Sequence, residues 1–138
     1  MVPFHLAIPV DDLHAARTFY VDVLGAGVGR TNDRWIDFNI EGHQVTAHLV
    51  ADMPSSIATN AVDAHDVPVR HFGLVLSWDR WQSMAQALEA RGTTFLIKPH
   101  VRFAGEVGEQ ATLFLTDPAG NAIELKSFRD PERLFATR

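Results

Sequence analysis

The order of predicted strands and helices runs twice along the chain, and this internal repeat constrains the fold more than any other feature. An apolar strand opens the sequence at residues 4–10, and a helix with apolar side chains at helical spacing follows at 13–24. Two strands with alternating polar and apolar residues come next, at 34–40 and 43–50. From residue 69 the same order begins again. Each half is too small to bury a sheet and a helix well by itself, so we expect the halves to pair.

The second half ends in a predicted hairpin. Its elements are a strand at 70–77, a helix at 78–91, a strand at 93–98, a loop at 99–109, and strands at 110–116 and 122–128. The last two strands are joined by Asp-Pro-Ala-Gly-Asn, a composition typical of a turn. Between the halves, prolines, serines and aspartates predict a linker or flexible loop. We therefore expect a single domain over 1–138, divided into module one (1–50), a linker (51–68), module two (69–128) and a C-terminal tail (129–138).

The composition excludes several classes of protein. The sequence contains no cysteine, which rules out disulfides, thiolate metal sites and a cysteine nucleophile. The formal net charge is −5 and the 12 basic residues are scattered, so we expect no nucleic-acid partner. No apolar run approaches the roughly 18 residues needed to span a bilayer, and the N-terminus has no signal-peptide pattern. We therefore expect a cytoplasmic protein without a membrane partner.

Several predicted strands turn a histidine or a glutamate away from their apolar side. Side chains alternate across a strand, so His5 shares one face with small residues while large apolar residues take the other. His71 opens the first strand of the second half in the same way, and His48 and Glu124 lie opposite apolar faces. Imidazole and carboxylate groups are the ligands of Fe, Mn, Ni and Zn, and two histidines with one carboxylate form the facial triad that activates oxygen. The pattern predicts a divalent-metal site.

Three stretches of sequence resemble the vicinal oxygen chelate superfamily, which includes glyoxalases, extradiol ring-cleavage dioxygenases and bleomycin-resistance proteins. They are HLAIPVDDLHAARTFYVDVLG at the start, RHFGLVL at the opening of module two, and FLTDPAGNAIELKSF at its end. The resemblance implies an α+β fold in which two paired βαβββ modules form a cupped mixed sheet with a metal inside. The segments GHQVTAHL and PHVRFAGEVGEQ further resemble a bacterial branch predicted to be extradiol-dioxygenase-like.

The resemblance also implies a ligand set. His5 matches the ligand of the first module, His71 that of the second, and Glu124 the terminal ligand. His48 falls where glyoxalase-type members place a glutamate, so it is either a fourth ligand or an acid–base residue beside the metal. Fe²⁺ is the expected ion, with Zn²⁺, Ni²⁺ and Mn²⁺ as alternatives.

Two further residues are candidates for catalysis. His100 and Arg102 fall in the predicted loop 99–109, where they could present a proton donor and an anion clamp to a substrate from a mobile lid. The alternative is that both are ordinary solvated loop residues.

The expected function is that of a metal-dependent, extradiol-dioxygenase-like oxidoreductase that binds neighbouring oxygens of a small, catechol-like substrate. One alternative is a glyoxalase-type lyase or isomerase, for which a histidine at position 48 is the wrong residue. Another is a non-enzymatic small-molecule binding or resistance protein, which would not need the ligands. The family implies a homodimer, and the sequence leaves open whether the cup closes within one chain or across the dimer.

Overall fold

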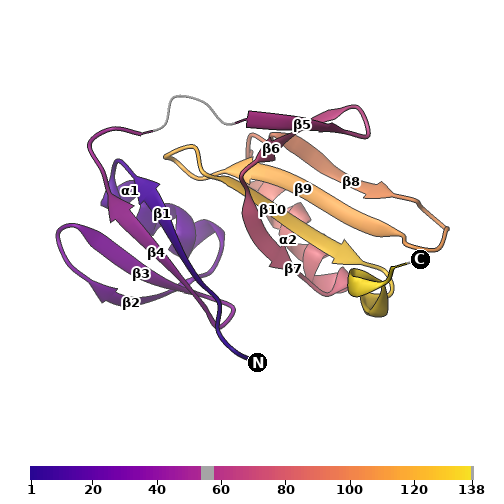
Figure 1. Ribbon diagram of the computed structural model, residues 1–138, viewed down its shortest axis with the longest axis horizontal. Coiled ribbons are helices and arrows are strands. Elements are labelled where there is room, and N and C mark those ends of the chain that lie inside the picture. The colour runs from indigo at the N-terminus through magenta and orange to yellow at the C-terminus, as the bar shows by residue number, and fades with distance from the viewer. Residues whose placement is uncertain (54–57, 138) are drawn as a thin grey trace. The chain divides into compact units, whose positions relative to one another are not determined.

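The computed structural model describes residues 1–53 and 58–137, which form two compact units (Figure 1). The first unit comprises Met1–Ile57 together with Asp117–Asn121, and the second comprises Ala58–Thr116 and Ala122–Arg138. Residues 54–57 of the predicted linker lie outside the described part of the chain.

The first unit is one βαβββ module. It contains β1 (His5–Val10), α1 (Leu13–Thr18), the π-helical turn η1 (Phe19–Val23), β2 (Gly27–Thr31), β3 (Trp35–Ile40) and β4 (His43–Leu49). The strand order is β1-β4-β3-β2, with β1 parallel to β4 and the other pairs antiparallel. The helix begins as the sequence predicts, because the Asp12 carboxylate accepts a hydrogen bond from the backbone N–H of Ala15 at 2.9 Å.

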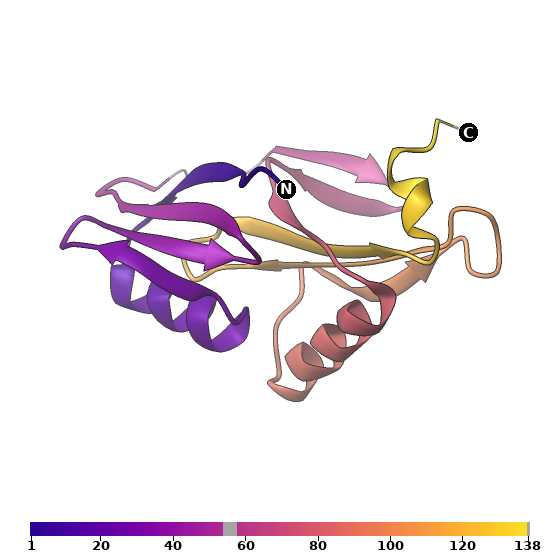
Figure 2. The same cartoon turned by 90° about the horizontal axis from the view of Figure 1, so that it is seen from below.

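The second unit repeats the plan and adds a hairpin. It contains β5 (Ala58–Val62), β6 (His65–Val69), β7 (Phe72–Val75), α2 (Trp78–Ala90), β8 (Ile97–Arg102), β9 (Gln110–Thr116), β10 (Ala122–Phe128) and the 3-10 helix η2 (Pro131–Phe135). The four-stranded sheet has the order β7-β10-β9-β8, and β5 and β6 form a two-stranded sheet. In Figure 2, α2 lies on one face of this sheet and the β5–β6 hairpin lies on the opposite face.

The observed architecture confirms the predicted α+β fold of two βαβββ modules. In each module the first strand lies parallel to the last, β1 to β4 and β7 to β10. Apolar residues of both four-stranded sheets are buried, which gives each module an apolar core. The largest fully buried side chains are Tyr20, Phe38, Leu88, Leu113, Leu115, Ile123, Leu125 and Val10.

Three local predictions were wrong. The interval 51–68 contains most of the β5–β6 hairpin, in which a proline and aspartates hid the alternation of polar and apolar residues. The turn residues of this hairpin, Asp63 and Ala64, both adopt positive φ. The strand predicted at 93–98 is placed too early, since β8 spans Ile97–Arg102 with a register shift between Ile97 and His100, and the interval 99–109 is therefore not all loop. Strand β2 was missed because it contains two glycines, which are rare inside strands.

A buried carboxylate holds the 117–121 turn within the first unit. Oδ2 of Asp117 accepts hydrogen bonds from the Tyr20 hydroxyl and from Nδ2 of Asn121, both at 2.8 Å. Oδ1 accepts from the backbone N–H groups of Ala119 and Asn121, and Nδ2 of Asn121 also donates to the carbonyl of Pro9. Burial raises the pKa of Tyr20, and the negative charge of Asp117 raises it further. The hydroxyl is therefore a stable donor to this carboxylate.

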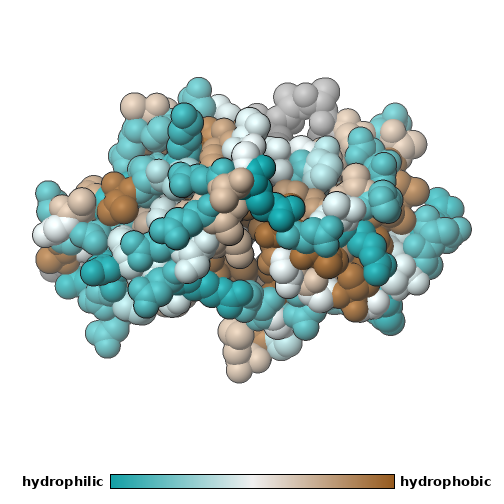
Figure 3. All heavy atoms as spheres, turned by 180° about the vertical axis from the view of Figure 1, so that it is seen from behind, coloured by the Kyte–Doolittle hydropathy of each residue, from teal (hydrophilic) through white to brown (hydrophobic). Residues whose placement is uncertain are grey.

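Some apolar side chains remain exposed in both units, among them Phe4, Val69, Val107 and Phe135. Figure 3 shows hydrophobic residues interspersed with hydrophilic ones over one face. None of the helices in the described part of the chain has the length and apolar character needed to span a bilayer.

Candidate metal centre

Two of the predicted ligands, His71 and Glu124, meet in the second unit. His71 directly precedes β7, and Glu124 lies on β10 opposite Gly73 of β7. Nε2 of His71 lies 3.2 Å from Oε2 of Glu124, and the side chains are only 29% and 14% exposed. The structure therefore brings an imidazole and a carboxylate from the two ends of module two to within contact distance.

The hydrogen bonds of His71 determine which of its nitrogens can bind an ion. Nδ1 lies 2.6 Å from the carbonyl oxygen of Pro68 at the end of β6. A carbonyl only accepts, so Nδ1 carries the proton and, in the neutral ring, Nε2 is an acceptor. Nε2 and the carboxylate oxygen of Glu124 are then two acceptors that face each other. Such a pair requires a cation, either a shared proton or a metal ion, and the donor set fits a divalent metal.

The second oxygen of Glu124 has its own partners. The hydroxyl of Thr112 donates to Oε1 at 2.7 Å, and Nζ of Lys126 lies 3.8 Å from the same oxygen. The carboxylate is thereby oriented with Oε2 toward His71. The ring of Phe114 packs edge-on against the His71 ring, with centroids 5.0 Å apart, and so restricts its rotation.

A glycine allows β7 to lie this close to the ligand-bearing strand. A Cβ atom at Gly73 would lie 1.6 Å from the carbonyl oxygen of Glu124 and 2.6 Å from its carbonyl carbon. No side chain fits there without separating the strands. Gly73 therefore sets the spacing between His71 and Glu124.

The register of the first module shows which residue is equivalent to Glu124. In module two, Gly73 lies two residues after His71 and pairs with Glu124. In module one, Ala7 lies two residues after His5 and pairs with Thr46. Thr46 therefore occupies the equivalent position. His48 lies two residues beyond this position on β4, a difference that the sequence alone did not reveal because it did not fix the strand register.

Thr46 is already engaged. Its hydroxyl donates to Oδ1 of Asp37 at 2.6 Å, and Nε of Arg30 lies 3.5 Å from Oδ2. Asp37 is buried, and the Thr46 hydrogen bond lowers the pKa of its carboxyl, against the opposing effect of burial and with help from Gln44 and Arg30. Module one therefore offers His5 as a donor but no carboxylate at the equivalent of Glu124.

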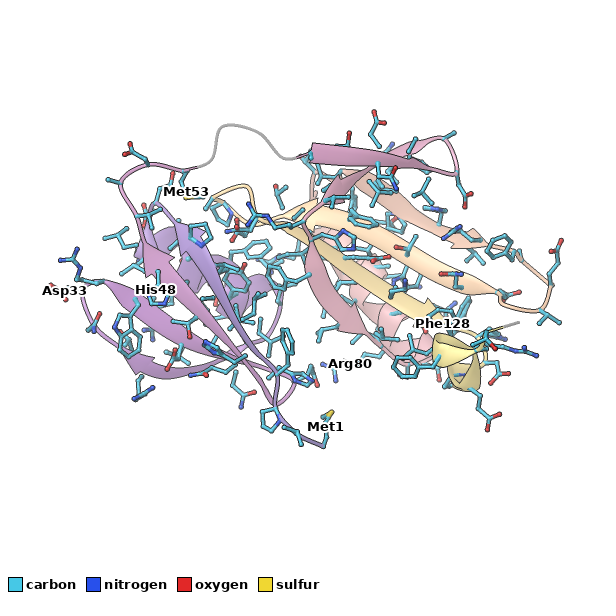
Figure 4. The ribbon with its side chains drawn as sticks, in the orientation of Figure 1. Met1, Asp33, His48, Met53, Arg80 and Phe128 are labelled. Carbon is cyan, nitrogen blue, oxygen red and sulfur yellow. The ribbon has the colours of Figure 1, made fainter. Side chains whose placement is uncertain are left out.

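His48 is exposed on β4, where it pairs with Pro9 (Figure 4). His5 pairs with Gln44, four residues earlier. At about 3.3 Å per residue the two histidines are about 13 Å apart along the sheet, too far for both to bind one ion within this unit. The register thus argues against His48 as a ligand beside His5.

His100 and Arg102 lie on β8 and contact the β5–β6 hairpin. Nδ1 of His100 lies 2.9 Å from the carbonyl oxygen of Lys98, and its ring is 5.1 Å from that of His65, centroid to centroid. Arg102 forms an ion pair with Asp63 at the hairpin turn. The anion clamp predicted for Arg102 is therefore already paired with a carboxylate of the chain.

Within residues 1–53 and 58–137, no three His, Asp or Glu side chains lie close enough to hold one ion. The structure brings together His71 and Glu124, and their partners Thr112 and Lys126 were not identified as site residues from the sequence. A signal for them exists: the Asp-Pro-Ala-Gly-Asn turn sets the antiparallel register, which pairs Thr112 with Lys126, two residues beyond Glu124 on β10.

Comparisons with known proteins agree with this architecture. No curated protein matches the sequence. A glyoxalase/bleomycin resistance protein/dioxygenase from Alicyclobacillus acidocaldarius has 30% sequence identity and a TM-score of 0.80, over 97% of this chain and 96% of that chain. Two more distant structures share the fold. A fosfomycin resistance protein from Listeria monocytogenes has 16% identity and a TM-score of 0.70, with 97% and 98% of the chains covered. A lactoylglutathione lyase from Agrobacterium tumefaciens has 18% identity and a TM-score of 0.63, with 91% and 92% covered.

The sequence profile of one family covers most of the chain. The profile described as Glyoxalase/Bleomycin resistance protein/Dioxygenase superfamily matches residues 3–125, which run from before β1 into β10 and include the His71–Glu124 pair. The chain belongs to the glyoxalase/bleomycin resistance protein/dioxygenase superfamily.

Proposed function

We propose that the chain is a metal-dependent enzyme that binds two neighbouring oxygens of a small substrate on a divalent ion held by His71, Glu124 and His5. The observation that carries the proposal is the contact between His71 and Glu124, in which two acceptor atoms lie 3.2 Å apart while their other atoms are already hydrogen-bonded. Ligands oriented by such outer hydrogen bonds are typical of protein metal sites.

The composition of the ligand set favours an extradiol-dioxygenase-like reaction on a catechol-like substrate. Because Thr46 stands at the equivalent of Glu124, module one contributes a histidine without a carboxylate. Two histidines and one carboxylate leave open positions, as in the non-haem Fe²⁺ oxygenases. When bound, Fe²⁺ would supply Lewis-acid and redox chemistry at these positions. A glyoxalase-type reaction would instead be expected to use a carboxylate where Thr46 stands.

The residues of the chain have distinct roles in this proposal. The Pro68 carbonyl holds Nδ1 of His71, and the Thr112 hydroxyl holds Oε1 of Glu124, so both ligands are oriented before the substrate arrives. Nδ1 of His100 donates to the carbonyl of Lys98, which leaves its Nε2 as an acceptor for a substrate hydroxyl proton. We assign no step to His48 or Arg102. His5 would complete the site within one chain or from the second subunit of a homodimer.

Metal analysis of the purified protein tests the proposal. We expect one divalent ion per site in the wild type, and loss of that ion in His71→Ala and Glu124→Ala. His14→Ala is the matched control, because His14 is an exposed histidine on α1. Full metal content in His71→Ala would refute the site.

Oxygen consumption by the Fe²⁺-loaded protein with a panel of catechols tests the reaction class. Uptake of oxygen that disappears in Glu124→Ala supports the dioxygenase-like reaction. A metal-loaded protein that consumes no oxygen with catechols but isomerises a hemithioacetal would identify the lyase alternative instead. A protein that binds small molecules without metal would be a binding or resistance protein.

A further inference from the structure

We propose that Lys126 binds an anionic group of the substrate, so that the substrate carries a carboxylate or a similar anion in addition to its two chelating oxygens. This inference rests on the proposed metal function and extends it to the substrate class. Lys126 follows Glu124 by two residues on β10, and alternation places both on the same face of the sheet. The burial pattern agrees, since Leu125 and Ser127 are fully buried while Glu124 and Lys126 are half-buried.

The strand register locates Lys126 relative to the metal ligands. It pairs with Val75 of β7 on one side and with Thr112 of β9 on the other, and Thr112 pairs in turn with His100 of β8. These residues form a row across the sheet that lies two residues beyond Glu124, which is about 7 Å along the strands. Since Nζ of Lys126 lies 3.8 Å from Oε1 of Glu124, an anion bound to this ammonium and oxygens bound to an ion on Oε2 would fall within the length of one small molecule.

The charges around Glu124 favour an anion at Lys126 once a metal ion is bound. Nζ of Lys126 lies 3.8 Å from Oε1 of Glu124, and its side chain is 30% exposed. Without a metal, the ammonium and the carboxylate partly neutralise each other. A divalent ion on Oε2 of Glu124 would place two further positive charges beside this ammonium, and like charges at this range repel. An anionic group of the substrate at Lys126 would offset this repulsion.

Two apolar residues, Phe128 and Val75, also lie beside Lys126. Nζ lies 5.6 Å from the centre of the Phe128 ring, and the side chain of Val75 is 48% exposed. Arg102 does not compete for the anion, since it is paired with Asp63. The site therefore fits a compact apolar framework, such as an aromatic ring, with vicinal oxygens at one end and a carboxylate at the other.

Matched chelators test the inference by binding rather than by turnover. Catechol and its carboxylated analogues protocatechuate and homoprotocatechuate are titrated calorimetrically into Ni²⁺-loaded protein without oxygen. We expect the better carboxylated analogue to bind the wild type about tenfold or more tightly than catechol, the range of a hydrogen bond between charged groups. In Lys126→Met this preference is expected to fall to about onefold.

The chain offers a close control, because its two lysines are Lys98 and Lys126. Lys98 is exposed on β8, and Lys98→Met should keep the full preference. Lys126→Arg keeps the positive charge and should retain most of the preference for the carboxylated analogue. This result would show that the loss in Lys126→Met is not caused by misfolding. An equal preference in the wild type and Lys126→Met, with metal bound to both, would overturn this inference alone. Failure of the wild type to bind any metal would overturn the proposed function as well.

Discussion

Raising the pH tests the buried contact between Tyr20 and Asp117. Tyr20 is 0% exposed, and its hydroxyl donates to Oδ2 of Asp117 at 2.8 Å. Burial, and then the negative charge and hydrogen bond of Asp117, raise the pKa of Tyr20 well above its ordinary value of 10.0. We therefore expect the tyrosine to remain protonated for as long as the protein stays folded.

The sign and the size of the effect follow from linkage. In the unfolded chain the tyrosine ionises near pH 10.0, whereas in the folded chain it does not. The contribution of Tyr20 to stability is thus complete below that pH and is lost as the pH rises above it. Each pH unit above 10 should lower the free energy of unfolding by about 1.4 kcal/mol on account of this one proton. At neutral pH, Tyr20→Phe should lower the free energy of unfolding by about 1.5 kcal/mol, the lower end of the range for a hydrogen bond to a charged group. The lower end applies because Asn121 still donates a hydrogen bond to Oδ2 of Asp117 in the variant.

Tyr20 is the only tyrosine of the chain, so the ultraviolet absorbance of tyrosinate reports this residue alone. The absorbance should appear only together with the loss of far-ultraviolet circular dichroism, at about pH 11 or above. Tyr20→Phe should lose stability less steeply above pH 10 than the wild type does. Tyrosinate absorbance that rises near pH 10 while the circular dichroism stays native would refute the reasoning.

Two further substitutions test the strand contacts of the modules. Gly73→Ala should lower the free energy of unfolding by about 3 kcal/mol, since the new Cβ meets the Glu124 carbonyl at 1.6 Å. Gly29→Ala is the control, because its nearest neighbour is Cβ of Asp37 at 3.4 Å; equal urea midpoints for the two variants would contradict the packing. Thr46→Val removes the hydrogen bond that contributes most to the lowered pKa of Asp37. That bond stabilises the fold above pH 3.8, and its contribution is lost as the pH falls through the lowered pKa of Asp37 in the folded protein. In urea unfolding, the loss of stability of Thr46→Val relative to the wild type should therefore be largest near neutral pH and smaller at about pH 3. A deficit independent of pH would count against an ionised Asp37.

The sequence was sufficient to predict the fold and the proximity of His71 and Glu124. The repeat was readable because each half has the same order of alternating and helical segments. The pair His71 and Glu124 was readable because both lie on polar faces of apolar strands, near a turn of distinctive composition. These features are local, and local patterns survive in a single sequence.

Features that depend on pairing between distant segments were not predicted. The equivalence of Thr46 and Glu124 needs the parallel register of the first and last strands, which alternation alone leaves ambiguous by two residues. The ion pair of Arg102 with Asp63 needs the β5–β6 hairpin, which proline and aspartate hid within an apparent linker. In both cases the polar residue was noticed but its partner was not.

The two halves of the repeat are not self-sufficient pieces. The turn Asp117–Asn121 comes from the end of the second half but packs with the first, where it supplies the acceptor for Tyr20. A fragment ending at residue 57 would bury the Tyr20 hydroxyl without its hydrogen-bond acceptor, Asp117. It would also lose the hydrogen bond from Asn121 to the carbonyl of Pro9. A first half produced alone should therefore be less stable than it is in the whole chain, even though it contains a complete set of strands for its own sheet.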